Sequence, residues 1–457
     1  MTKVTASGRR ISAGLYMFLI CLLSLQIRPT VAFSRYSRPG RARQRQQLVA
    51  PHVAAADETS SKAAGCPFER AFPRYKIDLR NTKDKSKKGL LSKVVKAPSL
   101  LREWQSTAQL QVLKSKYPDS HVAVHLGLDG AHAMAVLWET AADFLTNTEN
   151  PSSRANNVVI ALEDRTLSQN FCVIFDWAVS HVPDLQDVKH LLQVEFLAED
   201  KAVRLAYTVN DDSNDVPLRK QPLHDSNEIN QHTQAWVQRV LVKMGICPFT
   251  KSRKMSGQGL SDVGVPVGKI AYHTSSAINA IVLLADTWKA MVEFLDAGPE
   301  AQSSILLAAP AYDDTFGTWA GPIFCLLEST VVAAHAEADL GVVCFHPAYA
   351  TPDGTTWPGF GHMHSVPRLA QWVQQEQDQR QKEKQGTFSP LSREDIAAGG
   401  AWQRRTPHST INVLRADQLA RAEGRRDSAS LYPRNIRALL AVGNEQLQHD
   451  LEQERLL

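Results

Sequence analysis

The chain has 457 residues, a length that suits two or three compact domains. Its hydrophobic content of 43% and charged content of 21% are typical of a globular protein, and they exclude a fully disordered chain and a polytopic membrane protein. The formal net charge of +4 averages two unlike parts, because residues 1–56 hold nine Lys and Arg and no acid. The rest holds the other 42 of the 51 bases against all 47 acids, a net charge of −5, so the charge gives no reason to expect a nucleic-acid partner.

Residues 1–32 have the pattern of a signal peptide. Three basic residues near the start precede an apolar stretch, Leu15–Leu25, which is too short for a stable transmembrane helix. A site for cleavage after a small residue follows at Ala32. A basic start, an apolar centre and a small residue at the end together predict a segment that is removed from the mature protein.

Residues 33–56 have the composition of an organelle transit peptide, because they are rich in Arg, Ser, Gln and Ala and contain no acid. Phe33 directly follows the predicted cleavage site. The arrangement resembles the bipartite leaders of algae with secondary plastids, which implies a plastid location. Secretion, or residence in the endomembrane lumen, is the alternative. In either case we expect no membrane partner for the mature form.

The cysteines favour a reduced compartment over secretion. After loss of the leader the chain keeps an odd number of them, without a Cys-x-x-Cys pair. A disulfide scaffold and a structural zinc site are therefore not expected. The five are Cys66, Cys172, Cys247, Cys325 and Cys344.

Apolar periodicity and polar linkers divide the rest of the chain. We expect an irregular linker over residues 57–117, with one helix near Leu100–Lys114, and a second linker over residues 210–230. The parts that remain read as a first α/β unit, residues 118–209, and a second α/β unit, residues 231–450. The second carries an insertion at about residues 351–403, in which residues 371–385 are charged all round and predict an exposed helix or disorder.

The two units resemble each other when one is slid along the other by about 148 to 153 residues. Each reads as strand, helix, strand, helix, strand, and apolar and aromatic residues recur in the same order. This pattern indicates an internal repeat whose copies could pack as an intramolecular pseudo-dimer. The matched segments are 122–125 with 270–273, Trp138 with Trp288, 144–145 with 294–295, 158–161 with 305–308, 171–172 with 324–325, and 194–196 with 343–345.

Four short motifs in the second unit resemble domain-of-unknown-function family 1415 (DUF1415). An amphipathic helix runs into the first of them, and the resemblance extends over residues 231–443 apart from the insertion. The motifs are Gly245-Ile246-Cys247-Pro248-Phe249, His346-Pro347-Ala348-Tyr349, Arg405-Thr406-Pro407-His408 and Tyr432-Pro433-Arg434-Asn435.

The chain departs from the family pattern in both units. Ala348 stands where the family usually has an acid, and His408 stands where it usually has Tyr. The first unit keeps Cys66-Pro67-Phe68, but Leu197 follows Phe196 in place of His-Pro. We therefore predict an α/β fold of two tandem related units, each a small sheet with helices, in which the second unit is complete and the first is degenerate and structural.

The motifs of the second unit supply the candidate site residues. Candidate catalytic residues are those able to serve as nucleophile or base, and candidate ligand-binding residues are those able to hold an anion. A packed inert thiol at position 247, a structural turn at position 346 and ordinary surface arginines are the competing interpretations. The catalytic candidates are Cys247, His346 and His408, and the ligand-binding candidates are Arg405, Arg415 and Tyr349.

Three functions remain open from the sequence. The first is an enzyme or a small-ligand-binding protein, in which case Cys247, His346 and Arg405 should lie within about 10 Å of one pocket. The second is a non-catalytic interaction or assembly protein. The third is a haem- or metal-binding protein, although His346, His362, His364 and Asp353 do not form a known ligand signature. The sequence assigns no metal-ligand residues, and it leaves the identity of any cofactor open.

Overall fold

A computed structural model describes the chain from residue 99 onward, apart from a few short gaps. All described residues lie in the compact part Pro67–Leu457. The predicted signal and transit segments, and most of the linker over residues 210–230, lie outside the described residues. The described ranges are 99–146, 157–186, 188–189, 191–207, 225–354, 360–383, 389–423 and 428–457.

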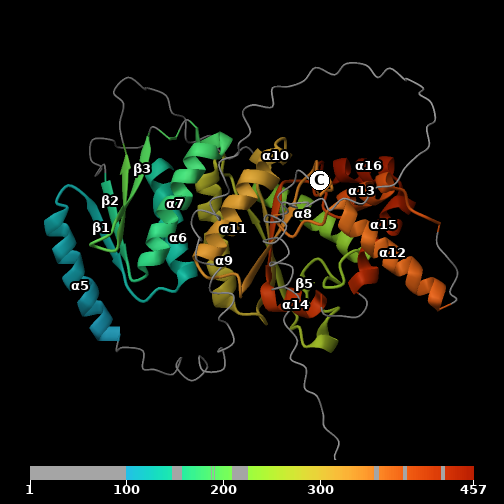
Figure 1. The fold of residues 1–457 in the computed structure, drawn as a ribbon, viewed down its shortest axis with the longest axis horizontal. Coiled ribbons are helices and arrows are strands. Elements are labelled where there is room, and N and C mark those ends of the chain that lie inside the picture. The colour runs from blue at the N-terminus through green and yellow to red at the C-terminus, as the bar shows by residue number, and fades with distance from the viewer. Residues whose placement is uncertain are drawn as a thin grey trace, which may run out of the picture. The chain divides into compact units, whose positions relative to one another are not determined.

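The first unit is a four-stranded sheet with helices (Figure 1). The strand order is β1-β2-β4-β3, in which β1 and β2 are parallel and the other neighbours are antiparallel. Helix α5 is the helix expected near Leu100–Lys114. The elements are α5 (Ser99–Lys116), β1 (His121–His125), α6 (Gly130–Thr146), β2 (Asn157–Leu162), α7 (Arg165–His181), the 3-10 helix η3 (Pro183–Leu185), β3 (Leu192–Leu197) and β4 (Ala202–Tyr207).

The second unit is a five-stranded sheet of order β5-β6-β7-β9-β8. Strands β6 and β7 are parallel, and the other neighbours are antiparallel. Its elements up to β8 are α8 (Ser226–Trp236), η4 (Val237–Lys243), β5 (Met255–Ser256), η5 (Ser261–Val263), β6 (Gly268–Thr274), α9 (Ala280–Ala297), β7 (Gln302–Ala308), η6 (Pro310–Tyr312), α10 (Phe316–Thr318), η7 (Trp319–Ile323), α11 (Phe324–Ala333) and β8 (Leu340–Phe345). Those after it are α12 (Val366–Lys382), α13 (Arg393–Trp402), β9 (Thr410–Arg415), α14 (Ala416–Glu423), α15 (Ser428–Val442) and α16 (Asn444–Glu454).

The two sheets share one strand order and one set of strand directions, with β1, β2, β4 and β3 in the places of β6, β7, β9 and β8. The α/β fold of two tandem units is thereby confirmed. The sequence interpretation missed β4, because the first unit joins β3 to β4 by a short turn at residues 198–201, in which Lys201 has a positive φ of 53°. The second unit makes the same connection through α12 and α13.

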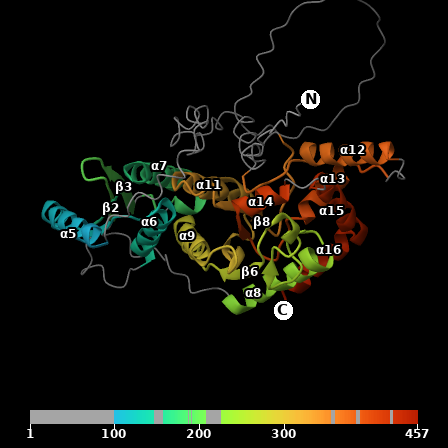
Figure 2. The same ribbon diagram turned by 90° about the horizontal axis from the view of Figure 1, so that it is seen from below.

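Equivalent helices of the two units pack against each other. Helix α6 lies beside α9 and helix α7 beside α11, as Figures 1 and 2 both show. Trp138 of α6 and Trp288 of α9 are fully buried. The Trp288 indole donates a hydrogen bond to Thr330 Oγ1 at 3.0 Å, whereas Trp138 packs against Phe171 and Phe175.

Helices α10 and α11, with the π-helical turn η7, form one long apolar segment, Phe316–Ala333. In the described part of the chain it is the one helical stretch with the length and hydropathy to cross a membrane, and 67% of it is buried inside the fold. Pro322 lies within η7, where its missing N–H accounts for the local change of helix type. The segment is the central helix between the two sheets' helical layers.

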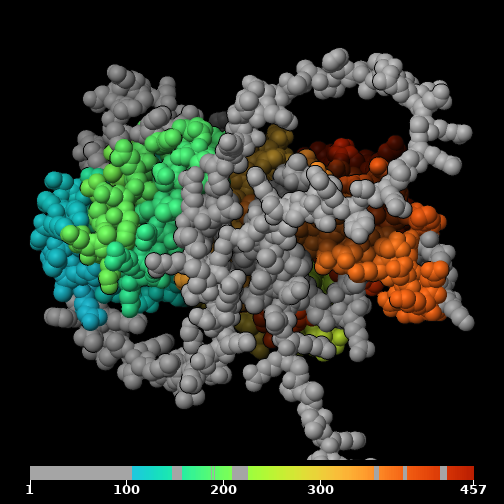
Figure 3. Space-filling model, viewed as in Figure 1, coloured from blue at the N-terminus to red at the C-terminus, as the bar shows by residue number. Residues whose placement is uncertain are grey.

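The insertion contains two ordered helices. The stretch over residues 371–385 was predicted to be an exposed helix or disordered, and α12 is helical to Lys382 and stands on the surface in Figure 3. Its first half is not solvated, however, because Val366, Leu369 and Val373 are buried against α13 and α15. The sequence analysis missed this apolar stripe because polar and charged residues lie on every side of the last two turns of α12.

Candidate functional site

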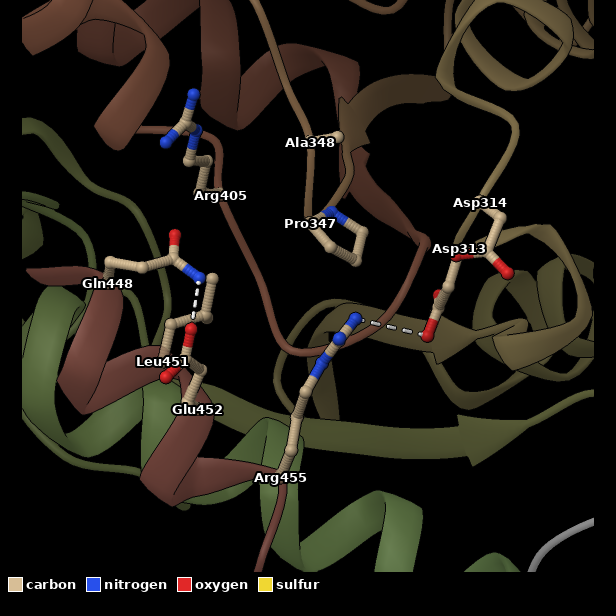
Figure 4. A pocket seen from close by; sticks show the side chains of 9 residues that line it. All are labelled: Asp313, Asp314, Pro347, Ala348, Arg405, Gln448, Leu451, Glu452 and Arg455. Carbon is tan, nitrogen blue, oxygen red and sulfur yellow. Dashed lines mark hydrogen bonds and ion pairs between the residues drawn. The ribbon is translucent and has the colours of Figure 1, made fainter.

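A pocket of about 340 Å³ lies at one edge of the second sheet (Figure 4). Segments from three strand ends meet there, because β7 and β8 end at this edge and β9, which runs antiparallel to both, begins at it. Ligand sites of open α/β sheets usually occupy such carboxyl ends. Helix α16 closes the pocket. The lining residues are Asp313, Asp314, Pro347, Ala348, Arg405, Gln448, Leu451, Glu452 and Arg455.

Arg405 enters the pocket on a rigid support. Its Nε donates to the carbonyl of Tyr349 at 3.2 Å, and its guanidinium carbon lies 4.3 Å from the centre of the Trp402 ring. Partial burial lowers the pKa of Arg405. Among the described residues, neither terminal nitrogen of its guanidinium has a hydrogen-bond partner. The Arg405 guanidinium is therefore held in place, and its two terminal nitrogens can donate hydrogen bonds to a ligand.

Asp313 is the most heavily bonded side chain of the pocket. One carboxylate oxygen accepts the backbone N–H of Ser409 at 2.6 Å, and the other accepts Nδ1–H of His408 at 2.8 Å. Arg455 reaches the second oxygen at 3.3 Å, as the dashed line in Figure 4 shows, and also donates to the carbonyl of Pro407 at 2.6 Å. The loop before β9 is thus tied to the loop after β7.

His408 continues this network away from the pocket. Its Nε2 lies 3.0 Å from Nδ1 of His232 on α8, and both imidazoles are buried. In the neutral tautomer of His408 that donates from Nδ1 to the carboxylate, Nε2 is an acceptor, and Nδ1 of His232 is then the donor of the hydrogen bond between the two rings. His232 Nε2 in turn lies 3.9 Å from Glu228 Oε1. The chain of groups can carry a proton between α8 and Asp313.

His346 supports the pocket and does not line it. The side chain is fully buried. Its Nε2 donates to the carbonyl of Tyr312 at 2.9 Å, and its Nδ1 accepts the N–H of Ala348 at 3.0 Å. Burial lowers the pKa of His346, which favours this neutral form. With both ring nitrogens occupied, His346 fixes the loops after β7 and β8.

Cys247 lies in the turn after η4 and is absent from the pocket lining. The Thr250 hydroxyl donates to its sulfur at 3.6 Å, and burial raises the pKa of the thiol. Asn435 and Arg434 of α15 hold the turn by donating to the carbonyls of Ile246 and Gly245, at 2.8 and 3.0 Å. Of Cys247, His346 and Arg405, only Arg405 lines the pocket.

The other predicted ligand-binding residues serve the scaffold. Arg415 lies at the far end of β9 from the pocket, where it donates to the carbonyls of Phe294 and Gln302 and packs over the Phe294 ring. Tyr349 is 1% exposed, its carbonyl accepts from Arg405, and burial raises the pKa of its hydroxyl. The structure therefore does not bring Arg415 and Arg405 together around an anion.

No group of three or more His, Cys, Asp or Glu side chains in the described residues could hold a metal ion. Nε2 of His364 lies 2.8 Å from the Tyr432 hydroxyl, and burial lowers the pKa of both His362 and His364. The His364 imidazole packs between Trp372 of α12 and Tyr432 of α15.

Part of the second unit matches one protein family. Residues 228–357 match the family described as "Protein of unknown function (DUF1415)". The resemblance expected from the sequence is confirmed over this range, which begins in α8 and stops within the first residues of the insertion. No curated protein and no solved structure matches the chain.

The DUF1415 match includes the pocket residues from Asp313 to Ala348, whereas Arg405 and Arg455 lie beyond its end. Sequence reasoning missed Asp313, His232 and Arg455. The sequence could have pointed to Asp313, because it follows a buried strand that a proline ends. Ligand sites of open α/β sheets usually lie at this carboxyl end of the strands. His232 lies on α8 and Arg455 directly follows α16, and nothing in their sequence neighbourhood sets them apart.

Proposed function

We propose that the second unit binds a small molecule through an anionic group, a carboxylate or a phosphate, with Arg405 as its principal anchor. The observation that carries this proposal is the guanidinium of Arg405, a residue that lines the pocket: the Tyr349 carbonyl and the Trp402 ring fix it, and its terminal nitrogens have no hydrogen-bond partner among the described residues. A held guanidinium fork suits either anion because two parallel hydrogen bonds form at little entropic cost. Arg455 also lines the pocket, but its charge is paired with Asp313, and Asp314 and Glu452 add two further carboxyl groups, so Arg405 is the cation left for an anionic ligand.

An acid–base enzyme is the second candidate function. The chain from Asp313 through His408 to His232 favours it, because such a chain orients one proton acceptor by another. In this candidate Asp313 is the group that meets the ligand, since it lines the pocket and the two imidazoles do not. Identifying the ligand that binds in the pocket would identify the substrate of such an enzyme, and with it the reaction.

Binding of simple anions by the purified full chain tests the first proposal. We expect inorganic phosphate, acetate or succinate to raise the melting temperature and to give a saturable calorimetric signal. Arg405→Gln should weaken binding of the preferred anion by about tenfold or more, the factor that loss of a charge-assisted hydrogen bond gives.

Arg253→Gln is the matched control, because this exposed arginine carries the same charge and lies outside the pocket lining. It should bind as the wild type does. Equal affinities of all three proteins for every anion would refute the role of Arg405.

We also propose that the chain is addressed to a plastid. The support is the sequence pattern of residues 1–56, with its apolar centre, its acid-free basic tail and Phe33 between them. The absence of a Cys-x-x-Cys pair agrees with a reduced destination better than with secretion. A fluorescent fusion of residues 1–56, expressed in an alga with secondary plastids, tests the address: plastid fluorescence supports it, and fluorescence in the secretory route opposes it.

A further inference from the structure

The pocket loop that follows β7 is held from two sides. On the side of the second sheet, His346 donates to the carbonyl of Tyr312, while His408 and Ser409 donate to the next residue, Asp313. On the opposite side the partner comes from the first unit. The Tyr312 hydroxyl donates to Oδ2 of Asp184 at 2.6 Å.

Asp184 lies in η3, directly after α7, and so belongs to the unit that the sequence suggested is degenerate. Burial raises the pKa of its carboxyl group, while hydrogen bonds from the Tyr312 hydroxyl and the backbone N–H of Ala280 oppose that rise. Ala280 is the first residue of α9, so the carboxylate also lies at a helix N-terminus, where negative charge is favoured. Two elements of the second unit thus converge on one side chain of the first.

The Tyr312 side chain has little room to move away from Asp184. Its ring is 4% exposed and packs against Trp319 at a centroid distance of 5.4 Å. A buried hydroxyl that loses its acceptor has to move toward water or remain unsatisfied, and either outcome is costly. A shift of Tyr312 would move its carbonyl away from His346. It would also displace Asp313, because Asp313 is the next residue in the chain.

We infer that Asp184 is a positioning residue for the pocket of the second unit: through the Tyr312 hydroxyl it sets the place of the loop that carries Asp313 and Asp314. This inference rests on the proposed anion-binding function. It gives the first unit a role in the site, although that unit contributes none of the residues that line the pocket.

Substitutions at both ends of the contact, made in the full chain, test the inference. Asp184→Leu and Tyr312→Phe should each weaken the binding of inorganic phosphate by about tenfold, a factor within the range for one lost buried hydrogen bond. Asp184→Asn should keep affinity near the wild type, because its amide oxygen still accepts from Tyr312. The ¹⁵N shifts of the His346 and His408 rings report the loop directly, and they should change in the first two variants only.

Asp296→Asn provides the matched control. Asp296 of α9 lies 3.4 Å from Nε2 of His132 of α6, so it also joins the two units, but it lies at the end of α9 that leads into β7, whereas the pocket loop follows the other end of β7, and it does not line the pocket. The inference is overturned if Asp184→Leu and Tyr312→Phe keep wild-type affinity and ring shifts, or if Asp296→Asn perturbs them equally. If Asp184→Leu does not fold, Tyr312→Phe decides. If the wild type binds no phosphate, the proposed function fails for that anion, and the ring shifts alone decide the positioning role.

Discussion

Glu328 on α11 is a carboxyl group in surroundings that disfavour its charge. The N–H of Gly361 donates to its Oε1 at 2.6 Å, yet burial raises the pKa of Glu328 to about 7. The folded protein therefore holds this proton between about pH 4.5 and pH 7, whereas the unfolded chain releases it. Because the folded state binds more protons in that window, stability falls as the pH rises through it.

We predict that Glu328→Gln stabilises the protein at pH 8. The amide oxygen keeps the hydrogen bond from Gly361, and the cost of the buried charge disappears, a gain of about 3 kcal/mol from the pKa shift. At pH 4, where the carboxyl is protonated in both states, the two proteins should be equally stable. Urea unfolding at the two pH values measures the difference, and a gain that is the same at both would contradict the explanation.

At the scale of elements, two of the segments expected from the sequence to resemble DUF1415 are joined by hydrogen bonds. The Tyr432-Pro433-Arg434-Asn435 segment of α15 donates to the backbone of the Gly245-Ile246-Cys247 turn. Gly245 occupies a positive φ of 66°, which ends the helical run from α8 through η4. The carbonyls of Gly245 and Ile246, just past this helix end, accept hydrogen bonds from another helix that is far away in the sequence. Cys247 is thus part of a helix-to-helix connection.

We predict that Asn435→Ala weakens this connection. Loss of the buried amide should cost about 1–3 kcal/mol of unfolding free energy, because the carbonyl of Ile246 loses its donor. It should also raise the rate at which a thiol reagent modifies Cys247. Arg434→Ala, which removes an exposed hydrogen bond to the same turn, is the comparison and should have a smaller effect. Equal rates of Cys247 modification in Asn435→Ala and wild type would exclude the proposed coupling.

At the scale of the whole molecule, we propose that the two units form an intramolecular pseudo-dimer. The proposal is supported by the common strand order of the two sheets and by the packing of α6 on α9 and α7 on α11. In such an arrangement each unit covers apolar helices of the other. The buried face of α9 includes Leu284, Trp288 and Met291.

We therefore predict that residues 225–457 are unstable when expressed without the first unit. Removal of α6 and α7 exposes apolar surface on α9 and α11, which favours aggregation or self-association. Analytical ultracentrifugation and thermal unfolding of the fragment beside the intact protein check this. A monomeric fragment that unfolds at the temperature of the intact chain would contradict the prediction.

The sequence by itself determined the strand-helix-strand-helix-strand order of each unit, the tandem arrangement and the DUF1415 resemblance over residues 228–357, because these depend on local apolar periodicity and short motifs. It also selected Arg405, which lines the pocket. It did not find β4, whose short strand follows a turn without a glycine or proline signal.

Only the tertiary structure decided which polar residues meet. Arg405 and Arg415 flank one strand, but the strand's length separates them, so one faces the pocket and the other binds carbonyls at the opposite edge. His346 has both ring nitrogens occupied by backbone groups that periodicity cannot predict. Asp184, Asp313 and His232 come from separate elements, and long-range packing brings each to its partners. Chemistry at a site depends on such distances between segments, which the order of residues along the chain does not fix.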